Sequence, residues 1–154
     1  RLAAADAVLV VGRLPERTEG TMGLEERRKL SDLRERAIPE IHQEILDDTG
    51  ADIALELDEA SFVADPDALN WVEYQGFKYL ANACRIIGTD ALGKQALQES
   101  VRTATWVNLP RERVAEKAAT LVAGALTVTG SWGLAGSDGW IGYDDLAKII
   151  TAAL

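Results

Sequence analysis

The stretch Ile53-Ala-Leu-Glu-Leu-Asp58 (IALELD) decides the fold class of this chain. Ile53, Leu55 and Leu57 alternate with small or acidic residues, which is the pattern of a β-strand with one buried and one exposed face. On both sides of it, apolar residues recur every three or four positions, a spacing typical of amphipathic helices. A strand between helices argues against both a pure helical bundle and a β-sandwich.

The segment 24–48 comes before this strand and carries a single apolar stripe. Pro39 lies within the stripe and has no amide hydrogen to donate, so the pattern predicts two helices or one helix bent at Ile38. Gly50 provides the helix stop. The stripe is formed by Leu30, Leu33, Ala37, Ile41 and Ile45.

The segment from Asp65 to Gly88 predicts the longest helix. Asp65-Pro66 is typical of a helix start, with the aspartate as cap and the proline at the first helical position. Glu73 and Lys78 are expected to face water. The predicted core stripe consists of Leu69, Val72, Gly76, Leu80, Ala83 and Ile87.

The C-terminal part continues with a short helix from Asp90 to about Ser100 and an alternating strand over 101–109. Residues 121–128 predict a hairpin that turns at Ala123-Gly124, although the alanines of 111–125 also allow a helix there. A glycine-rich loop follows. The aromatic residues of this C-terminal part are Trp106, Trp132, Trp140 and Tyr143, and two or three of them are expected to turn inward as anchors. The last predicted helix covers Asp144 to Leu154.

These elements predict one α+β domain over residues 22–154, with a small antiparallel or mixed sheet of about three to five strands covered by helices. At 154 residues and 47% hydrophobic content the chain can bury a full core. We interpret residues 1–21 as an N-terminal extension, non-native in origin, or as an edge strand formed by Val8–Val11.

The rarest residue types exclude several kinds of site. A single cysteine, Cys84, excludes a disulfide framework, and a single histidine, His42, excludes metal sites that need two. No apolar run reaches the roughly 18 residues of a membrane span, and residues 1–14 lack a signal-peptide pattern. We therefore expect a cytoplasmic protein with no metal, no cofactor and a buried, unreactive Cys84.

Negative charge is concentrated in the middle of the chain. The net charge is −9, and residues 37–77 hold eleven of the 25 acids and none of the 16 lysines and arginines. Such a field repels nucleic acids and anionic membranes and attracts basic proteins. Binding to nucleic acid or to a membrane is therefore not expected.

The string Asp48-Thr-Gly-Ala-Asp52 resembles the active-site motif of retroviral-type aspartic proteases, where two carboxylates share a proton. In that family the aspartate leaves a β-strand, whereas Asp48 ends a helical stripe here. No glycine-rich flap accompanies it. We interpret the string as a helix end stopped by Gly50, and we expect Asp48 to face solvent.

Residues 138–145 resemble the second half of an EF-hand calcium loop, with an aspartate, a glycine, an isoleucine and an acid at the family's spacing. Calcium needs about six to eight oxygen ligands, and Leu134 and Gly136 occupy positions where that loop supplies side-chain oxygens. We interpret the segment as a turn before a helix.

The leading functional hypothesis is a non-enzymatic interaction domain, an inhibitor, antitoxin-like or immunity-like protein, that binds a basic partner. A homodimer through leftover apolar residues of the predicted long helix is also expected. Two alternatives stay open: a carboxylate- or metal-dependent enzyme centred on Glu44, Asp47, Asp48 and Asp52, and a degenerate calcium-binding loop at 138–145. No catalytic residue is assigned. The predicted partner-binding surface is one contiguous patch of Asp47, Asp48, Asp52, Glu56 and Asp58.

Overall fold

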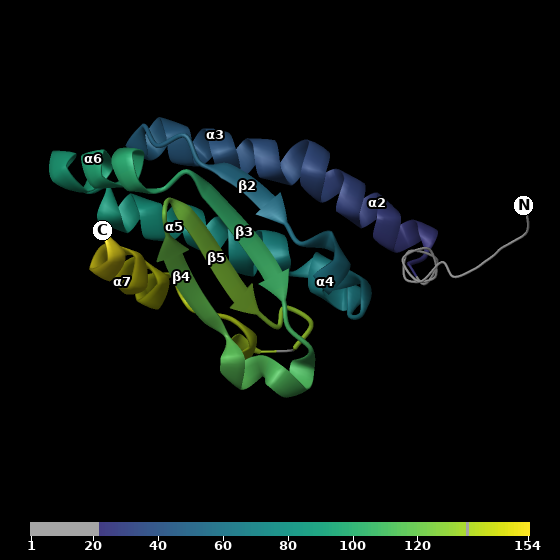
Figure 1. The fold of residues 1–154 in the computed structure, drawn as a ribbon. Coiled ribbons are helices and arrows are strands. Elements are labelled where there is room, and N and C mark those ends of the chain that lie inside the picture. The colour runs from purple at the N-terminus through teal and green to yellow at the C-terminus, as the bar shows by residue number, and fades with distance from the viewer. Residues whose placement is uncertain (1–21, 135) are drawn as a thin grey trace, which may run out of the picture.

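A four-stranded sheet lies against a layer of helices (Figure 1). The computed structural model describes residues 22–134 and 136–154, so the expectation for residues 1–21 falls outside the described part. The strand order is β2-β3-β5-β4, with the first three parallel and β4 antiparallel to β5. The predicted α+β class with a small mixed sheet is confirmed. The strands are β2 (Ala54–Leu57), β3 (Thr103–Asn108), β4 (Ala118–Val122) and β5 (Ala125–Gly130).

The first helical run is continuous across Pro39. Helix α2 (Leu24–Asp32) leads through a π-helical turn (Leu33–Ala37) into α3 (Ile38–Thr49). The Ile38 amide donates to the Leu33 carbonyl, one residue further back than in an α-helix. A π-turn widens the helix just before the proline, where regular α-helical packing would press the ring against the preceding turn. Both predicted helices are therefore present, joined without a break.

The prediction of one long helix from Asp65 to Gly88 is wrong, because this segment is not a single regular α-helix. After α4 (Glu59–Val63), residues Pro66–Asn70 form a 3₁₀ segment and Glu73–Phe77 a π-turn, before α5 (Lys78–Ile87) begins. Asp65 does not cap a helix, because its carboxylate accepts from Arg111 at 2.6 Å instead. The longest α-helix of the described residues is α3, with 12 residues.

The core stripe of that segment is nevertheless confirmed. Leu69, Val72, Gly76, Leu80 and Ala83 are buried, and Ile87 is partly buried. The prediction that Glu73 faces water is wrong, since its side chain is only 16% exposed and accepts from Arg36 at 2.8 Å. Hydrogen bonds to Asp32 and Glu73 raise the pKa of Arg36, whose guanidinium stays charged.

The C-terminal elements follow the predicted order. Helix α6 (Ala91–Ser100) is capped by Asp90, which accepts from the Gly93 amide at 2.8 Å. The hairpin β4–β5 turns at Ala123 and Gly124, both with positive φ, and this overturns the alternative of a helix over 111–125. The segment instead contains 3₁₀ turns over Arg111–Glu116, followed by β4. Helix α7 (Tyr143–Ala153) ends the chain and packs against α5.

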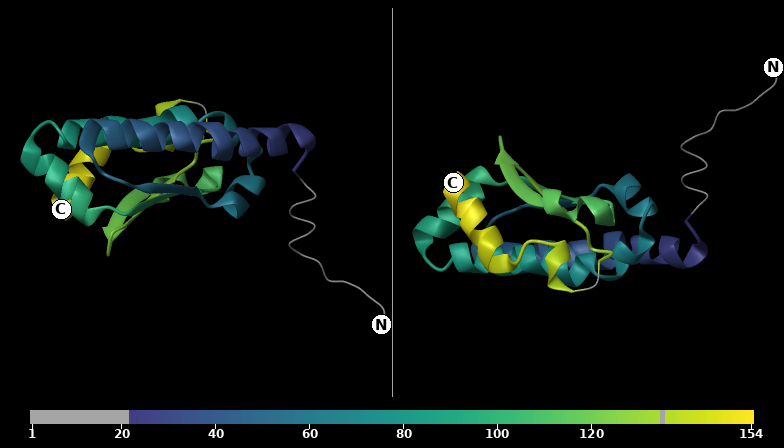
Figure 2. Two further views of the ribbon diagram at one scale, coloured as in Figure 1. Left: turned by 90° about the horizontal axis from the view of Figure 1, so that it is seen from above. Right: turned by 90° about the horizontal axis from the view of Figure 1, so that it is seen from below.

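The contact between α5 and the sheet is built around Trp106 of β3. The indole is fully buried and meets the Phe77 ring edge-on at a centroid distance of 4.7 Å. It also lies against Gly76, where a Cβ atom would come within 3.1 Å of the ring. Trp106 therefore marks the face of the sheet that the helices cover, and Figure 2 shows α3 and α5 on that side.

The opposite face of the sheet is open. Residues of β2 and β3 alternate in burial, so Glu56 and Thr105 project away from the helix layer while Leu55 and Trp106 project toward it. The register places Glu56 beside Thr105, Thr105 beside Thr127, and Thr127 beside Thr120. One row of the open face thus carries three threonines and a single carboxylate.

Replacing Gly76 by alanine tests the close approach of the helix to Trp106. The added methyl group would meet the indole at 3.1 Å and Val72 Cγ2 at 3.0 Å, and both neighbours are fully buried. Overpacking typically costs about 1–3 kcal/mol and exceeds the gain of roughly 1 kcal/mol in helix propensity. We expect Gly76→Ala to lower the free energy of unfolding by about 1 kcal/mol in urea denaturation.

A double variant provides the control. Trp106→Phe removes the indole atoms that the new methyl group would meet, together with a buried Nε1 that has no partner among the described residues. The cost of Gly76→Ala should therefore be smaller in the Trp106→Phe background. If Gly76→Ala costs the same free energy in both backgrounds, the indole does not set the distance between the helix layer and the sheet.

Candidate functional site

The carboxylates at the end of α3 are joined to α5 by ion pairs. Arg85 donates to Glu44 at 2.7 Å and to Asp48 at 3.0 Å, and Lys78 donates to Glu44 at 2.8 Å. Burial lowers the pKa of Arg85, but the hydrogen bonds that Arg85 donates to Asp48 and Glu44 outweigh this effect, so its pKa is raised overall. Glu44 and Asp48 therefore stabilise the contact between two helices and carry little uncompensated charge.

The next two acids are Asp47, in the last turn of α3, and Asp52, in the loop between α3 and β2. Gly50 has φ +74° and ends the helix with its amide bonded to the Leu46 carbonyl, as predicted. Gln43 donates to Asp47 at 2.7 Å, and His42 Nε2 lies 2.7 Å from Asp52 Oδ1. The Asp52 side chain is still 81% exposed.

The protease-like string is a helix end, as predicted. Asp48 lies in the last turn of α3, is exposed as expected, and pairs with Arg85. The Thr49 hydroxyl donates to the Ile45 carbonyl and accepts from the Ala51 amide, which fixes the turn. The string thus serves to terminate a helix.

The two remaining acids lie on and after β2. Asp58 caps α4 by accepting from the Ser61 amide, and its own carbonyl accepts from the Ser61 hydroxyl at 2.6 Å. Glu56 is exposed on the open face and has no hydrogen-bond or ion-pair partner among residues 22–134 and 136–154. Asp52, Glu56 and Asp58 consequently follow the course of β2.

The five acids of the predicted surface do not all point to one side of the molecule. Asp48 is turned toward Arg85 of the helix layer, whereas Glu56 projects from the opposite side of the sheet. Side chains alternate between the two faces of a strand. Leu55 points toward the helices, so its neighbour Glu56 points away from them. Asp48 is therefore separated from the three carboxylates that lie before, on and after β2.

Strand β2 has a free edge. The amides of Ala54 and Asp58 donate to Arg102 and Trp106 of the β3 strand and its approach, both at 2.9 Å. Because successive backbone groups point to opposite sides of a strand, those of Leu55 and Leu57 point outward. They have no backbone partner in the described part of the chain, and β2 is the outermost strand. Sequence reasoning missed this edge, since periodicity carries no information on strand order.

The geometry does not favour the two alternative sites. No group of three His, Cys, Asp or Glu side chains in the described ranges could hold a metal ion. Glu44 and Asp48 converge on a guanidinium instead of a cavity. In the calcium-like segment, the Asp138 carbonyl accepts from Lys117 at 2.7 Å, and the positive charge of this ammonium group disfavours a calcium ion beside it.

No protein-family model, curated protein or solved structure matches this chain. No helix within residues 22–134 and 136–154 combines the length and the apolar character that crossing a membrane requires.

The ion pairs at α3 predict a small effect of Asp48→Asn. Glu44 still holds Arg85 in the variant, and exposed pairs contribute about 0–1 kcal/mol. We expect an intact fold and a loss of less than about 1 kcal/mol in urea denaturation, shrinking further at high salt. Loss of the folded state would mean that Asp48 has a buried role that its exposure does not reveal.

The thiol of Cys84 provides a further test of the core. Cys84 is 1% exposed on the inner side of α5, and burial raises its pKa to about 12. The thiolate is the reactive form, so we expect no labelling by a disulfide reagent in the folded protein at pH 8 and rapid labelling in denaturant. Fast labelling of the folded protein would contradict the packing of α5.

Proposed function

We propose that this protein is an interaction domain that captures an extended, basic segment of a partner protein along the free edge of β2. The single observation that carries the proposal is the coincidence of that edge with exposed carboxylates. Asp52, Glu56 and Asp58 lie before, on and after β2, and none of them has a lysine or arginine partner among the described residues. The proposal narrows the predicted partner-binding residues to these three.

The backbone of β2 would supply the affinity. An exposed edge presents unpaired amide and carbonyl groups, which an added strand can satisfy with main-chain hydrogen bonds. Leu55 and Leu57 offer these groups outward, while their side chains stay on the core side. Each such bond contributes about 0.5–1.5 kcal/mol net, so a short segment needs further contacts for specificity.

The carboxylates would supply the specificity. Side chains of an added strand alternate between faces, and every second one would lie on the open face beside Glu56. On its other side Glu56 has the uncharged Thr105, so no group of the sheet compensates its charge. A lysine or arginine at alternate positions of the partner segment fits this arrangement. The net charge of −9 would also speed its capture at low salt.

The test uses the full chain, labelled with ¹⁵N, and two synthetic octapeptides that alternate threonine with lysine or with glutamate. We expect the lysine peptide to shift the Leu55 and Leu57 amide signals, to protect them from hydrogen exchange, and to bind more weakly as salt rises. Glu56→Gln should weaken binding roughly two- to five-fold, the effect of one cross-strand charge pair.

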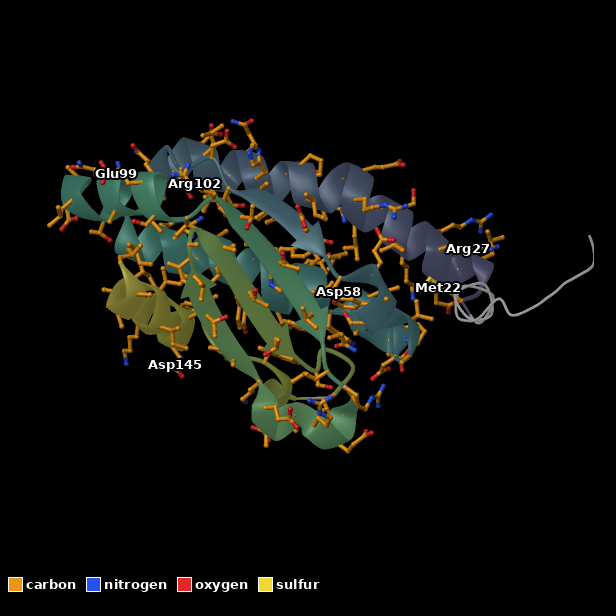
Figure 3. All side chains as sticks on the ribbon, in the orientation of Figure 1. Met22, Arg27, Asp58, Glu99, Arg102 and Asp145 are labelled. Carbon is orange, nitrogen blue, oxygen red and sulfur yellow. The ribbon has the colours of Figure 1, made fainter. Side chains whose placement is uncertain are left out.

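Asp145→Asn is the matched control, because Asp145 is an exposed acid on α7, far from Asp58 in Figure 3. It should leave the affinity unchanged. The proposal fails if the glutamate peptide binds equally well, if the Leu55 and Leu57 signals do not respond, or if Asp145→Asn weakens binding as much as Glu56→Gln. Concentration-dependent shifts of the same amides without peptide would assign the edge to a second copy of the chain, in a homodimer that uses β2 instead of the predicted long helix.

A further inference from the structure

A pocket of about 500 Å³ opens between the segment that leads into α5 and the glycine-rich loop after β5. This volume lies within the range of roughly 300–1,000 Å³ that small-molecule sites occupy. The pocket shares no residue with the β2 edge. The side chains used in the argument are Asp67, Asn70, Trp71, Gln75, Tyr79 and Trp140.

Three aromatic residues line this pocket. Tyr79 is held by Tyr143, whose ring meets it edge-on at 5.4 Å. Trp140 is only 8% exposed and follows Gly139, whose carbonyl accepts from the Ser131 amide at 2.6 Å. Trp71 is 48% exposed. Two aromatic side chains are thus fixed by packing, and the third is accessible to a ligand.

The polar groups of the pocket are acceptors or amides. The buried Oε1 of Gln75 has no hydrogen-bond partner among the described residues. The backbone around it is fixed, since the Gln75 carbonyl accepts from Trp132 Nε1 and its amide donates to the Trp71 carbonyl. The Gln75 side chain also lines the pocket, so a turn of its amide would present this acceptor to a ligand with an N–H or O–H group.

The charge at the pocket has one sign. No lysine, arginine or histidine within residues 22–134 and 136–154 lines it. The nearby Arg111 donates to Asp65 at 2.6 and 2.8 Å and to Asp67 at 3.3 Å, so two carboxylates face one guanidinium. The excess is one negative charge, which disfavours phosphates and carboxylates and favours a cation.

We infer that this pocket binds an organic cation of the alkylammonium type that also carries a hydrogen-bond donor. The positive charge lies against the faces of the aromatic rings, which attract cations through their quadrupole. The alkyl groups pack on the same rings, and Asp67 adds long-range attraction. Gln75 Oε1 accepts from the ligand's N–H or O–H group once its amide turns toward the pocket.

The experiment measures binding to the full chain by calorimetry, with choline and butylammonium as probes. The matched ligand is 3,3-dimethylbutan-1-ol, which has the shape and hydroxyl group of choline without its charge. We expect either cation to bind about five- to thirty-fold more tightly than the neutral alcohol, the fold-change that one desolvated cation–π contact carries.

Variants of two neighbouring aromatics make the test specific. Trp71→Leu should weaken cation binding about five- to thirty-fold, and Trp71→Phe should restore part of it. Tyr74→Leu is the control, because Tyr74 is 61% exposed, lies in the same segment and does not line the pocket. A near-native ¹⁵N spectrum of each variant shows that the fold is intact.

Several outcomes would overturn the inference. Equal binding of the neutral alcohol would show that the pocket selects for apolar shape and not for charge. Failure of both cations to bind would exclude alkylammonium ions as ligands. Binding of glucose or adenosine that depends on Trp71, without binding of the cations, would assign the pocket to neutral stacking ligands. Equal losses in Trp71→Leu and Tyr74→Leu would show only unspecific contact with exposed aromatic rings.

Discussion

The packing of Trp106 against the backbone at Gly76 sets the distance between the sheet and the helices. The indole of Trp106 fills the space that the missing side chain of Gly76 leaves. The ring of Phe77, the next residue, packs edge-on against the same indole. Because Trp106 faces the helices, the alternation of side chains along each strand determines which other residues of the sheet face the helices and which face the open side. Glu56 is directed to the open face for that reason, and Leu55 to the core.

Arginine residues from outside residues 37–77 neutralise much of the negative charge of that segment. Arg36 contacts Asp32, Glu40 and Glu73; Arg85 contacts Glu44 and Asp48; and Arg111 contacts Asp65 and Asp67. Five of these seven pairs join residues more than thirty positions apart. A run of acids in the sequence is therefore a poor guide to the potential at the surface. The acids along β2 differ from those held by these arginines, because no lysine or arginine of the described residues contacts them.

The two proposed sites use different physics. The β2 edge offers backbone groups in a row with charge on one face, which suits an extended chain. The pocket at Trp71 is concave and aromatic, with a buried acceptor at Gln75, which suits a small ligand. They lie on separate elements and can be tested independently.

The sequence by itself determined the elements that local periodicity controls. The strand over 53–57, the helix end at Gly50, the hairpin turn at Ala123-Gly124 and nearly all of the core stripe before and within α5 follow from side-chain direction and turn chemistry. Only the tertiary structure decided that β2 lies at the edge, that Asp65 pairs with Arg111 instead of capping a helix, and that Asp48 and Glu56 face opposite sides. These outcomes depend on which segments meet in space, and such meetings are set by the packing of the whole core, whereas periodicity reports only on neighbours within a few residues.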